Sequence, residues 1–356
     1  VERVGRSRRI HGVDRGTQRL GDHLAPEQAP TPGVTRDDAD VGVGAMWLEV
    51  EQVGEVDLVD PRSLLVVIHP CRSSRSPSVR LMDDLLELSA SIIESGDVDK
   101  PFNRITNELS EVADGLAVVE SFSHSVVVDA GDGLVAFDAS HANTGGAVVE
   151  AIRGWTTTPV SHIVYTHGHA DHVGGSVAFD AAYDDITVLG HENVQRRFER
   201  YRYTNDWNVL INARQFGGVR GDFQMGDGAP QFIPADTLEP THVVGDHETV
   251  TVGSRTVELH HARGETDDHL WGWMPDEKWL FAGDFVIWNF PNAGNPQKVQ
   301  RYPIEWAAAL RDMASRRPEI LLPAHGLPVG GADRIEAMLT DIAGALEQLV
   351  ADVVEM

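Results

Sequence analysis

The chain has 356 residues, of which 42% are hydrophobic and 24% charged, the composition of a globular protein with a sizeable core. Its formal net charge of −26 disfavours nucleic acid and anionic membrane surfaces as partners, because both require a basic face. The single cysteine, Cys71, excludes an internal disulfide framework. No apolar run reaches the roughly 18 residues of a membrane span, and the first residues lack a secretory signal core, so we expect a cytoplasmic protein.

The first 81 residues differ in character from the rest of the chain. Residues 1–81 contain no lysine, are rich in Pro, Gly, Ser and Arg, and offer only Leu64–Ile68 as a strand candidate. We expect this segment to be poorly ordered, or to be a non-native extension if the natural start is Met82. Residues 82–114 then read as a helical lead-in, because apolar positions over 83–95 recur at helical spacing.

Strand and helix patterns alternate through the remainder, which indicates an α/β protein. An initial meander is predicted at Leu116–Phe122, Ser125–Asp129 and Leu134–Asp138, with a turn at Gly131-Asp132-Gly133. Further helices are predicted at Thr144–Gly154, Gly174–Tyr183, His191–Tyr201, Glu305–Arg317 and Ala332–Val353. Further strands are predicted at Ile163–Tyr165, Ile186–Leu189, Thr241–Val252, Arg255–His261, His269–Met274, Lys278–Ala282 and Ile320–Leu322.

Three histidines and an aspartate lie within the stretch Thr166–His172, directly after a buried strand pattern. His167 and His169 can face one point if the strand ending stays extended, because side chains alternate along a strand. Asp171 and His172 are adjacent and must diverge, which suits a second ion beside the first. Imidazole and carboxylate groups are ligands that Zn²⁺ prefers. The alternative is a polar loop that happens to be rich in histidine.

This motif, continued by Val173-Gly174-Gly175, resembles the signature of the metallo-β-lactamase-fold hydrolases. Two downstream residues fit the same resemblance: Asp284 looks like the carboxylate that bridges two metals, and His325 looks like the last ligand of the second metal. The resemblance implies an α/β fold arranged as a four-layer αββα sandwich, with a catalytic domain over 115–330. Residues 331–356 would follow as a C-terminal amphipathic helix, which could pair with a second copy or pack on its own domain.

One further ligand is expected in the turn Arg263–His269. Most of the fold family has a histidine at this place, whereas this chain has Glu265, which we favour as the ligand. His261 and His269 are alternatives, as is the neighbouring His260, although His260 and His261 point to opposite faces of their strand. A carboxylate brings the ligand shell close to neutral, which suits a monoanionic or neutral ester.

A glutamate in this turn resembles the alkyl sulfatase branch of the family. Asp284 departs from that branch, which typically has Glu there, and the chain stops at Met356 without the branch's long C-terminal regions. The resemblance implies a dinuclear zinc hydrolase that uses a metal-bridging hydroxide, oriented by Asp171, on alkyl sulfate esters with an apolar tail. The implied ligands are His167, His169 and Glu265 for one metal, Asp171, His172 and His325 for the other, and Asp284 for both.

Other chemistries of the same fold remain open: hydrolysis of a thioester, a lactone or a β-lactam, or a di-iron redox function. Iron or manganese could replace zinc in a carboxylate-rich site.

Two further features have open interpretations. Asp138 resembles the family's buried structural aspartate, or simply ends a strand. The arginine- and aromatic-rich segment 196–223 is either a solvated helix with an ordinary loop, or a lid that supplies apolar contacts and a cation for an anionic substrate.

Overall fold

The computed structural model describes residues 84–97, 99–100, 102–215, 230–294 and 298–356. The expected strand at Leu64–Ile68 and part of the segment 196–223 lie outside these residues. The described helices are α1 (Asp84–Ser95), α2 (Gly145–Trp155), α3 (Ala170–Val173), α4 (Ser176–Asp180), α5 (Asn193–Tyr203), α6 (Asn205–Gln215), α7 (Pro303–Ser315) and α8 (Ala332–Glu355).

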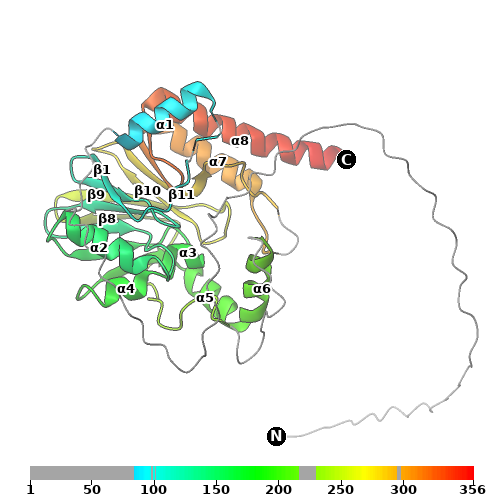
Figure 1. Ribbon diagram of the computed structural model, residues 1–356. Helices are drawn as coiled ribbons and strands as arrows, with labels where there is room; N and C mark the ends of the chain where they lie inside the picture. Colours follow the sequence, from blue (N-terminus) through cyan, green and yellow to red (C-terminus); the bar gives the residue numbers. More distant parts are fainter. Residues whose placement is uncertain (1–83, 98, 101, 216–229, 295–297) are drawn as a thin grey trace, which may run out of the picture. The chain divides into compact units, whose positions relative to one another are not determined.

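The strands of the described residues form two sheets (Figure 1). The first sheet contains β1 (Leu109–Ala113), β2 (Leu116–Val119), β3 (Ser125–Asp129), β4 (Leu134–Phe137), β5 (Val160–Val164), β6 (Thr187–His191) and β7 (His242–Val244), in that order. The second contains β8 (His247–Val252), β9 (Arg255–His261), β10 (Leu270–Met274), β11 (Trp279–Ile287), β12 (Ile320–His325) and β13 (Val329–Gly330), with β8 and β13 at its edges. Strands β4 to β7 are parallel neighbours, as are β11 and β12.

Three apolar clusters show the layers. Between the sheets, Phe137 of β4 stacks on Phe281 of β11 with ring centroids 3.8 Å apart. On the outer face of the first sheet, Val148 and Ile152 of α2 are fully buried. On the outer face of the second, α7 and α8 bury residues such as Leu310. The predicted αββα sandwich is therefore confirmed.

The structure differs from the sequence prediction in the connection between the sheets. One strand was expected over Thr241–Val252, and this was wrong: β7 completes the first sheet, and β8 begins the second after a break at Gly245 and Asp246. Sequence periodicity does not reveal such a change of partner, because both segments keep a strand pattern.

Four elements were not predicted: strands β1 and β13 and helices α3 and α6 have no counterpart in the prediction. The helix expected at Gly174–Tyr183 is shorter than predicted, because only α4 (Ser176–Asp180) forms within it, and Gly174 and Gly175 separate α4 from α3. A side chain at Gly175 would collide with the carbonyl oxygen of Ala139, so the close approach of these segments requires glycine there.

The C-terminal helix α8 packs on its own domain through Ile335, Leu339, Ala343 and Leu346, which are fully buried. Its far end is different, since Val354 is 80% exposed. Pairing of two copies through α8 remains a prediction.

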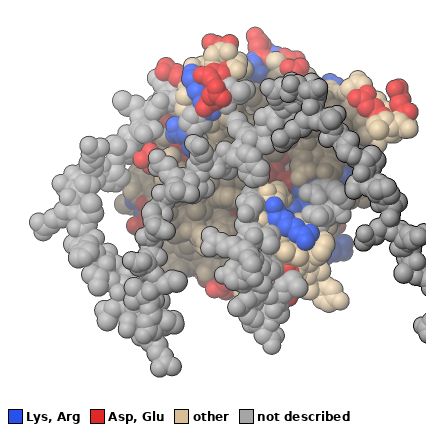
Figure 2. Space-filling model, turned by 45° about the vertical axis from the view of Figure 1, so that its right-hand side comes forward, with Lys and Arg blue, Asp and Glu red and all other residues tan. Residues whose placement is uncertain are grey.

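The surface of the described residues carries paired charges. Near the start of α8, Arg334 forms an ion pair with Glu94 of α1 at 2.7 Å. Figure 2 shows other places where acidic and basic side chains adjoin on the surface. No helix within the described residues is both long and apolar enough to cross a bilayer.

The stacked pair between the sheets makes a stability prediction. Replacing Phe281 with Ala removes a ring that is 1% exposed, and we expect the free energy of unfolding to fall by about 3–5 kcal/mol. Phe290→Ala is the control, because Phe290 is 63% exposed and should change stability by no more than about 0.5 kcal/mol. Denaturant unfolding measures both, and equal losses would contradict an inter-sheet core at Phe281.

Candidate metal centre

Seven polar side chains from both sheets converge at one edge of the sandwich. His167 and His169 follow β5, and Asp171 and His172 lie on α3. The second sheet contributes Glu265 from the β9–β10 loop, Asp284 from within β11 and His325 from the end of β12. Their ligand atoms, one from each residue, form two groups, and within each group all of these atoms lie within 4.8 Å of one another. The first group contains His167, His169, Glu265 and Asp284, and the second contains Asp171, His172 and His325.

The carboxylate of Asp284 faces both groups. Its Oδ1 lies 3.5 Å from Nε2 of His172 and 3.6 Å from Nε2 of His325. Its Oδ2 lies 4.0 Å from Nε2 of His167. Each oxygen of one side chain is thus turned toward a different group, which is the arrangement of a carboxylate that two cations could share.

Glu265 is the member of its turn that reaches the first group. Its Oε2 lies 3.8 Å from Nε2 of His167 and 3.6 Å from Nδ1 of His169. The weighed alternatives face elsewhere. His260 stacks on Trp271, His261 stacks on His191, and His269 accepts the backbone N–H of Asp284 at 3.2 Å.

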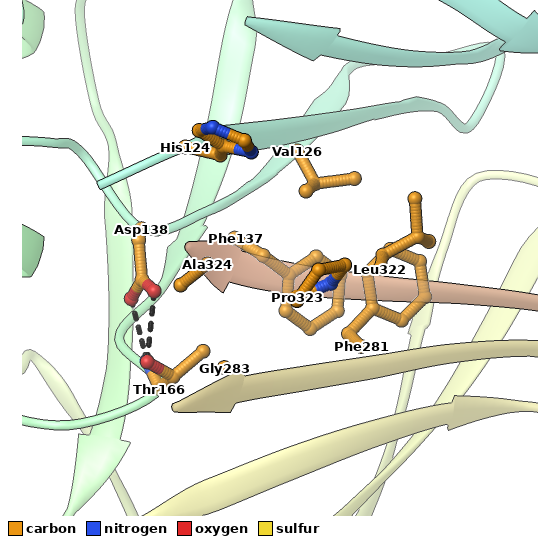
Figure 3. Close-up of a pocket in the computed structure, with 10 residues that line it drawn as sticks. All are labelled: His124, Val126, Phe137, Asp138, Thr166, Phe281, Gly283, Leu322, Pro323 and Ala324. Atoms are coloured by element: carbon orange, nitrogen blue, oxygen red, sulfur yellow. Dashed lines mark hydrogen bonds between the residues drawn. The ribbon is translucent and has the colours of Figure 1, made fainter. Parts of the chain in front are cut away.

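Asp138 supports the histidine-rich loop Thr166–His172 from behind (Figure 3). Its carboxylate accepts the backbone N–H of Thr166 at 2.7 Å and the Thr166 hydroxyl at 2.8 Å. Its Oδ2 also lies 2.8 Å from Nδ1 of His172, so the Nε2 of that ring is turned toward Asp284. Hydrogen bonds of this kind fix the orientation of a metal-binding imidazole. Thr166 and Phe281 are among the residues that line a small cavity of about 10 Å³, at the lower limit for one water.

A buried ion pair braces the same loop from the other side. Nε of Arg197, on α5, lies 2.8 Å from Oδ2 of Asp268, and that oxygen accepts the backbone N–H of Gly168 at 3.0 Å. Against the effect of burial, Arg197 lowers the pKa of Asp268 below its usual value, so the carboxylate stays charged. Arg197 belongs to the segment 196–223, and its guanidinium is engaged by Asp268 and Asp267. The sequence signals this role only weakly, through the acidic pair Asp267-Asp268 that follows Glu265 in the same turn.

The donor set fits divalent cations. Nε2 of His172 and Oδ1 of Asp284 are buried without a hydrogen-bond partner among the described residues, which is costly unless an ion or water satisfies them. Burial and the neighbouring histidines lower the pKa of His167 well below its usual value, so its ring is neutral, the form that binds metal. Burial also raises the pKa of Glu265, as do the nearby carboxylates of Asp284 and Asp171. A cation bound between these carboxylates would reduce their mutual repulsion.

A third group of donors lies away from this centre, on neighbouring strands of the second sheet. His247 of β8 lies opposite His260 of β9, and Glu258 is two residues from His260. There Arg316 already forms an ion pair with Glu258, with Nη1 3.0 Å from Oε2, the oxygen that also faces Nε2 of His260. The position for a cation is therefore taken by a guanidinium.

Comparison with known proteins identifies the family of the chain. A family model described as the metallo-beta-lactamase superfamily matches residues 118–325, more than half of the chain. The chain belongs to this superfamily. It is therefore a member of a hydrolase superfamily whose proteins usually bind metal ions and act on small molecules. The matched range contains all seven convergent side chains.

Two curated relatives illustrate the range of the superfamily. The chain is 24% identical to a linear primary-alkylsulfatase of Pseudomonas sp., over 60% of this chain and 43% of the relative. It is 22% identical to an atrochrysone carboxyl ACP thioesterase of Aspergillus fumigatus, over 67% of this chain and 44% of the relative. The chain thus spans less than half the length of these relatives.

A solved structure shows the same superfamily fold. The stereoselective inverting sec-alkylsulfatase of Pseudomonas sp. superposes with a TM-score of 0.59 at 20% sequence identity, over 70% of this chain and 43% of the other. At this identity the likeness concerns the fold.

The brace of the loop makes a second stability prediction. Arg197→Met leaves Asp268 buried without its cation, and we expect the free energy of unfolding to fall by about 3–5 kcal/mol. Arg202→Met is a matched control on the same helix, since the Arg202–Glu239 pair is exposed and should contribute no more than about 1 kcal/mol. Chemical denaturation compares the two, and a similar small loss in both variants would refute the bracing role.

Proposed function

We propose that this protein is a dinuclear zinc hydrolase. His167, His169 and Glu265 would hold one ion, Asp171, His172 and His325 would hold the other, and Asp284 would be shared. The observation that carries the proposal is the position of Asp284, whose two oxygens face the two groups of donors. An isolated polar loop would not recruit a carboxylate and a histidine from the opposite sheet.

When bound, two zinc ions supply an acidified water as nucleophile and polarise the substrate oxygen. The residues of the chain prepare the site for this chemistry. Asp138 and Asp268 hold the histidine-rich loop in one conformation. The Asp171 side chain is 24% exposed, with Oδ2 3.2 Å from Nε2 of His325, so it can accept a hydrogen bond from the attacking water and orient it.

The donor set suits zinc and leaves room for other metals. Its four imidazoles and three carboxylates are nitrogen and oxygen ligands that zinc accepts. The three carboxylates offset three of the four positive charges of two zinc ions, which weakens the attraction for highly charged anions and favours a monoanionic or neutral ester. Iron or manganese is compatible with the same carboxylate-rich set.

We propose alkyl sulfate esters with an apolar tail as substrates. The resemblance to the linear primary-alkylsulfatase and the glutamate at position 265 support this choice. Lys298 adds support, because a cation near the site complements a sulfate ester. Its Nζ lies 3.0 Å from Oδ1 of Asn212 on α6, and its pKa is lowered by burial and by Arg301, against the effect of Glu265 and Asp171.

Thioester hydrolysis is the second candidate function. The similarity to the Aspergillus thioesterase supports it, and a neutral ester also suits the proposed charge balance. The same fold carries many activities, so the site alone does not select among ester classes.

Loss of one donor tests the proposed centre. His167→Ala and Asp171→Ala should reduce turnover to below about 1% of the parent rate, because each removes a ligand of the ions that generate the nucleophile. Zinc content, measured by elemental analysis, should fall in parallel. His162→Ala is the control, since His162 lies on β5 before the motif and outside both donor groups. Full turnover by His167→Ala would overturn the site.

A substrate panel tests the reaction class. The zinc-loaded protein should release sulfate from dodecyl sulfate faster than it cleaves an acyl thioester, an acyl lactone or nitrocefin, with His167→Ala as the blank for each substrate. Faster cleavage of the thioester would favour the second candidate. Cleavage of nitrocefin alone would reject both ester proposals.

A further inference from the structure

Arg301 is a buried cation that binds Glu265 at two points. Its side chain is 2% exposed, its Nη2 lies 2.8 Å from Oε1 of Glu265, and its Nη1 donates to the backbone carbonyl of the same residue. A guanidinium that bonds both the side chain and the main chain of one residue restricts both.

The backbone around Arg301 holds it in place. The next residue, Tyr302, donates its N–H to the carbonyl of Gly264 at 3.0 Å, and the same Tyr302 accepts the N–H of Trp306 at 2.8 Å. Trp306 is 1% exposed and donates its indole N–H to the carbonyl of Phe285 at 2.9 Å. The segment that precedes α7 is thereby tied to the turn that contains Glu265 and to strand β11.

The two oxygens of Glu265 have different surroundings. Oε1 faces Arg301, whereas Oε2 faces His167 at 3.8 Å and His169 at 3.6 Å. We propose that Arg301 is a positioning residue that occupies one oxygen of Glu265 and leaves the other to bind the metal ion held with His167 and His169. This inference rests on the proposed dinuclear centre.

A glutamate needs such a partner more than a histidine would. Its side chain has one more rotatable bond than that of histidine, so holding it in one conformation costs more entropy. It also brings a full negative charge close to Asp284, and the guanidinium balances that charge on the side away from the metal. Glu265 and Arg301 therefore act as one unit, with Arg301 setting the direction of the ligand oxygen.

Zinc affinity provides the test. In Arg301→Met, competition with a chromophoric chelator should show one of the two zinc ions bound about 10- to 100-fold more weakly and the other unchanged. Arg301→Lys should recover only part of the loss in zinc affinity. Its ammonium group keeps the positive charge, but it lacks the planar guanidinium that can donate to two acceptors at once. Arg263→Met is the matched control: Arg263 lies in the same turn, and its ion pair with Glu305 is exposed, so both zinc affinities should stay at the parent values.

A double substitution separates positioning from a general structural role. In a Glu265→Ala background, Arg301→Met should cause no further change in zinc affinity, because the effect passes through Glu265. An equal further loss, or weakening of both ions alike in Arg301→Met, would overturn the inference. Parent affinity for both ions in Arg301→Met would also overturn it and leave the dinuclear centre intact. If the parent protein binds no zinc pair, the proposed function itself fails.

Discussion

The carboxylate of Asp284 is the constraint on which the rest of the site depends. It faces His172 and His325 with one oxygen and His167 with the other, so it links the donors that follow β5 to those of the second sheet. The preceding Gly283 has a φ of +52°, and a side chain there would lie 2.8 Å from Thr166. This conformation costs glycine little, and it brings β11 against the histidine-rich loop.

Each donor group is held by buried charges from elsewhere in the fold. Asp138 orients His172, the Arg197–Asp268 pair fixes Gly168, and Arg301 engages Glu265. Buried charges destabilise a protein unless they are paired, and pairing them in one geometry makes the surrounding loops rigid. The same contacts that keep these groups satisfied also fix where the donor atoms point. Stability and preorganisation of the site therefore have one physical source.

The superfamily and the residues of this chain answer different questions. Membership places the chain in a hydrolase superfamily that usually binds metal ions, and its relatives include an alkylsulfatase and a thioesterase. Substrate choice depends on the groups around the centre. Here those include a glutamate in place of the usual histidine, its partner Arg301 and the half-buried Lys298. All three add charge to the surroundings of the donor groups.

The sequence by itself determined the residues that chemistry requires and the class of fold. Histidine spacing in Thr166–His172 is local, and strand and helix periods are local, so both can be read without coordinates. Only the tertiary structure decided that Glu265 reaches the centre while His261 and His269 face elsewhere, that Thr241–Val252 divides between two sheets, and that Arg197 braces a loop. The reason is physical: these outcomes depend on contacts between residues distant along the chain, and side-chain direction there is set by packing and charge pairing that no local pattern encodes.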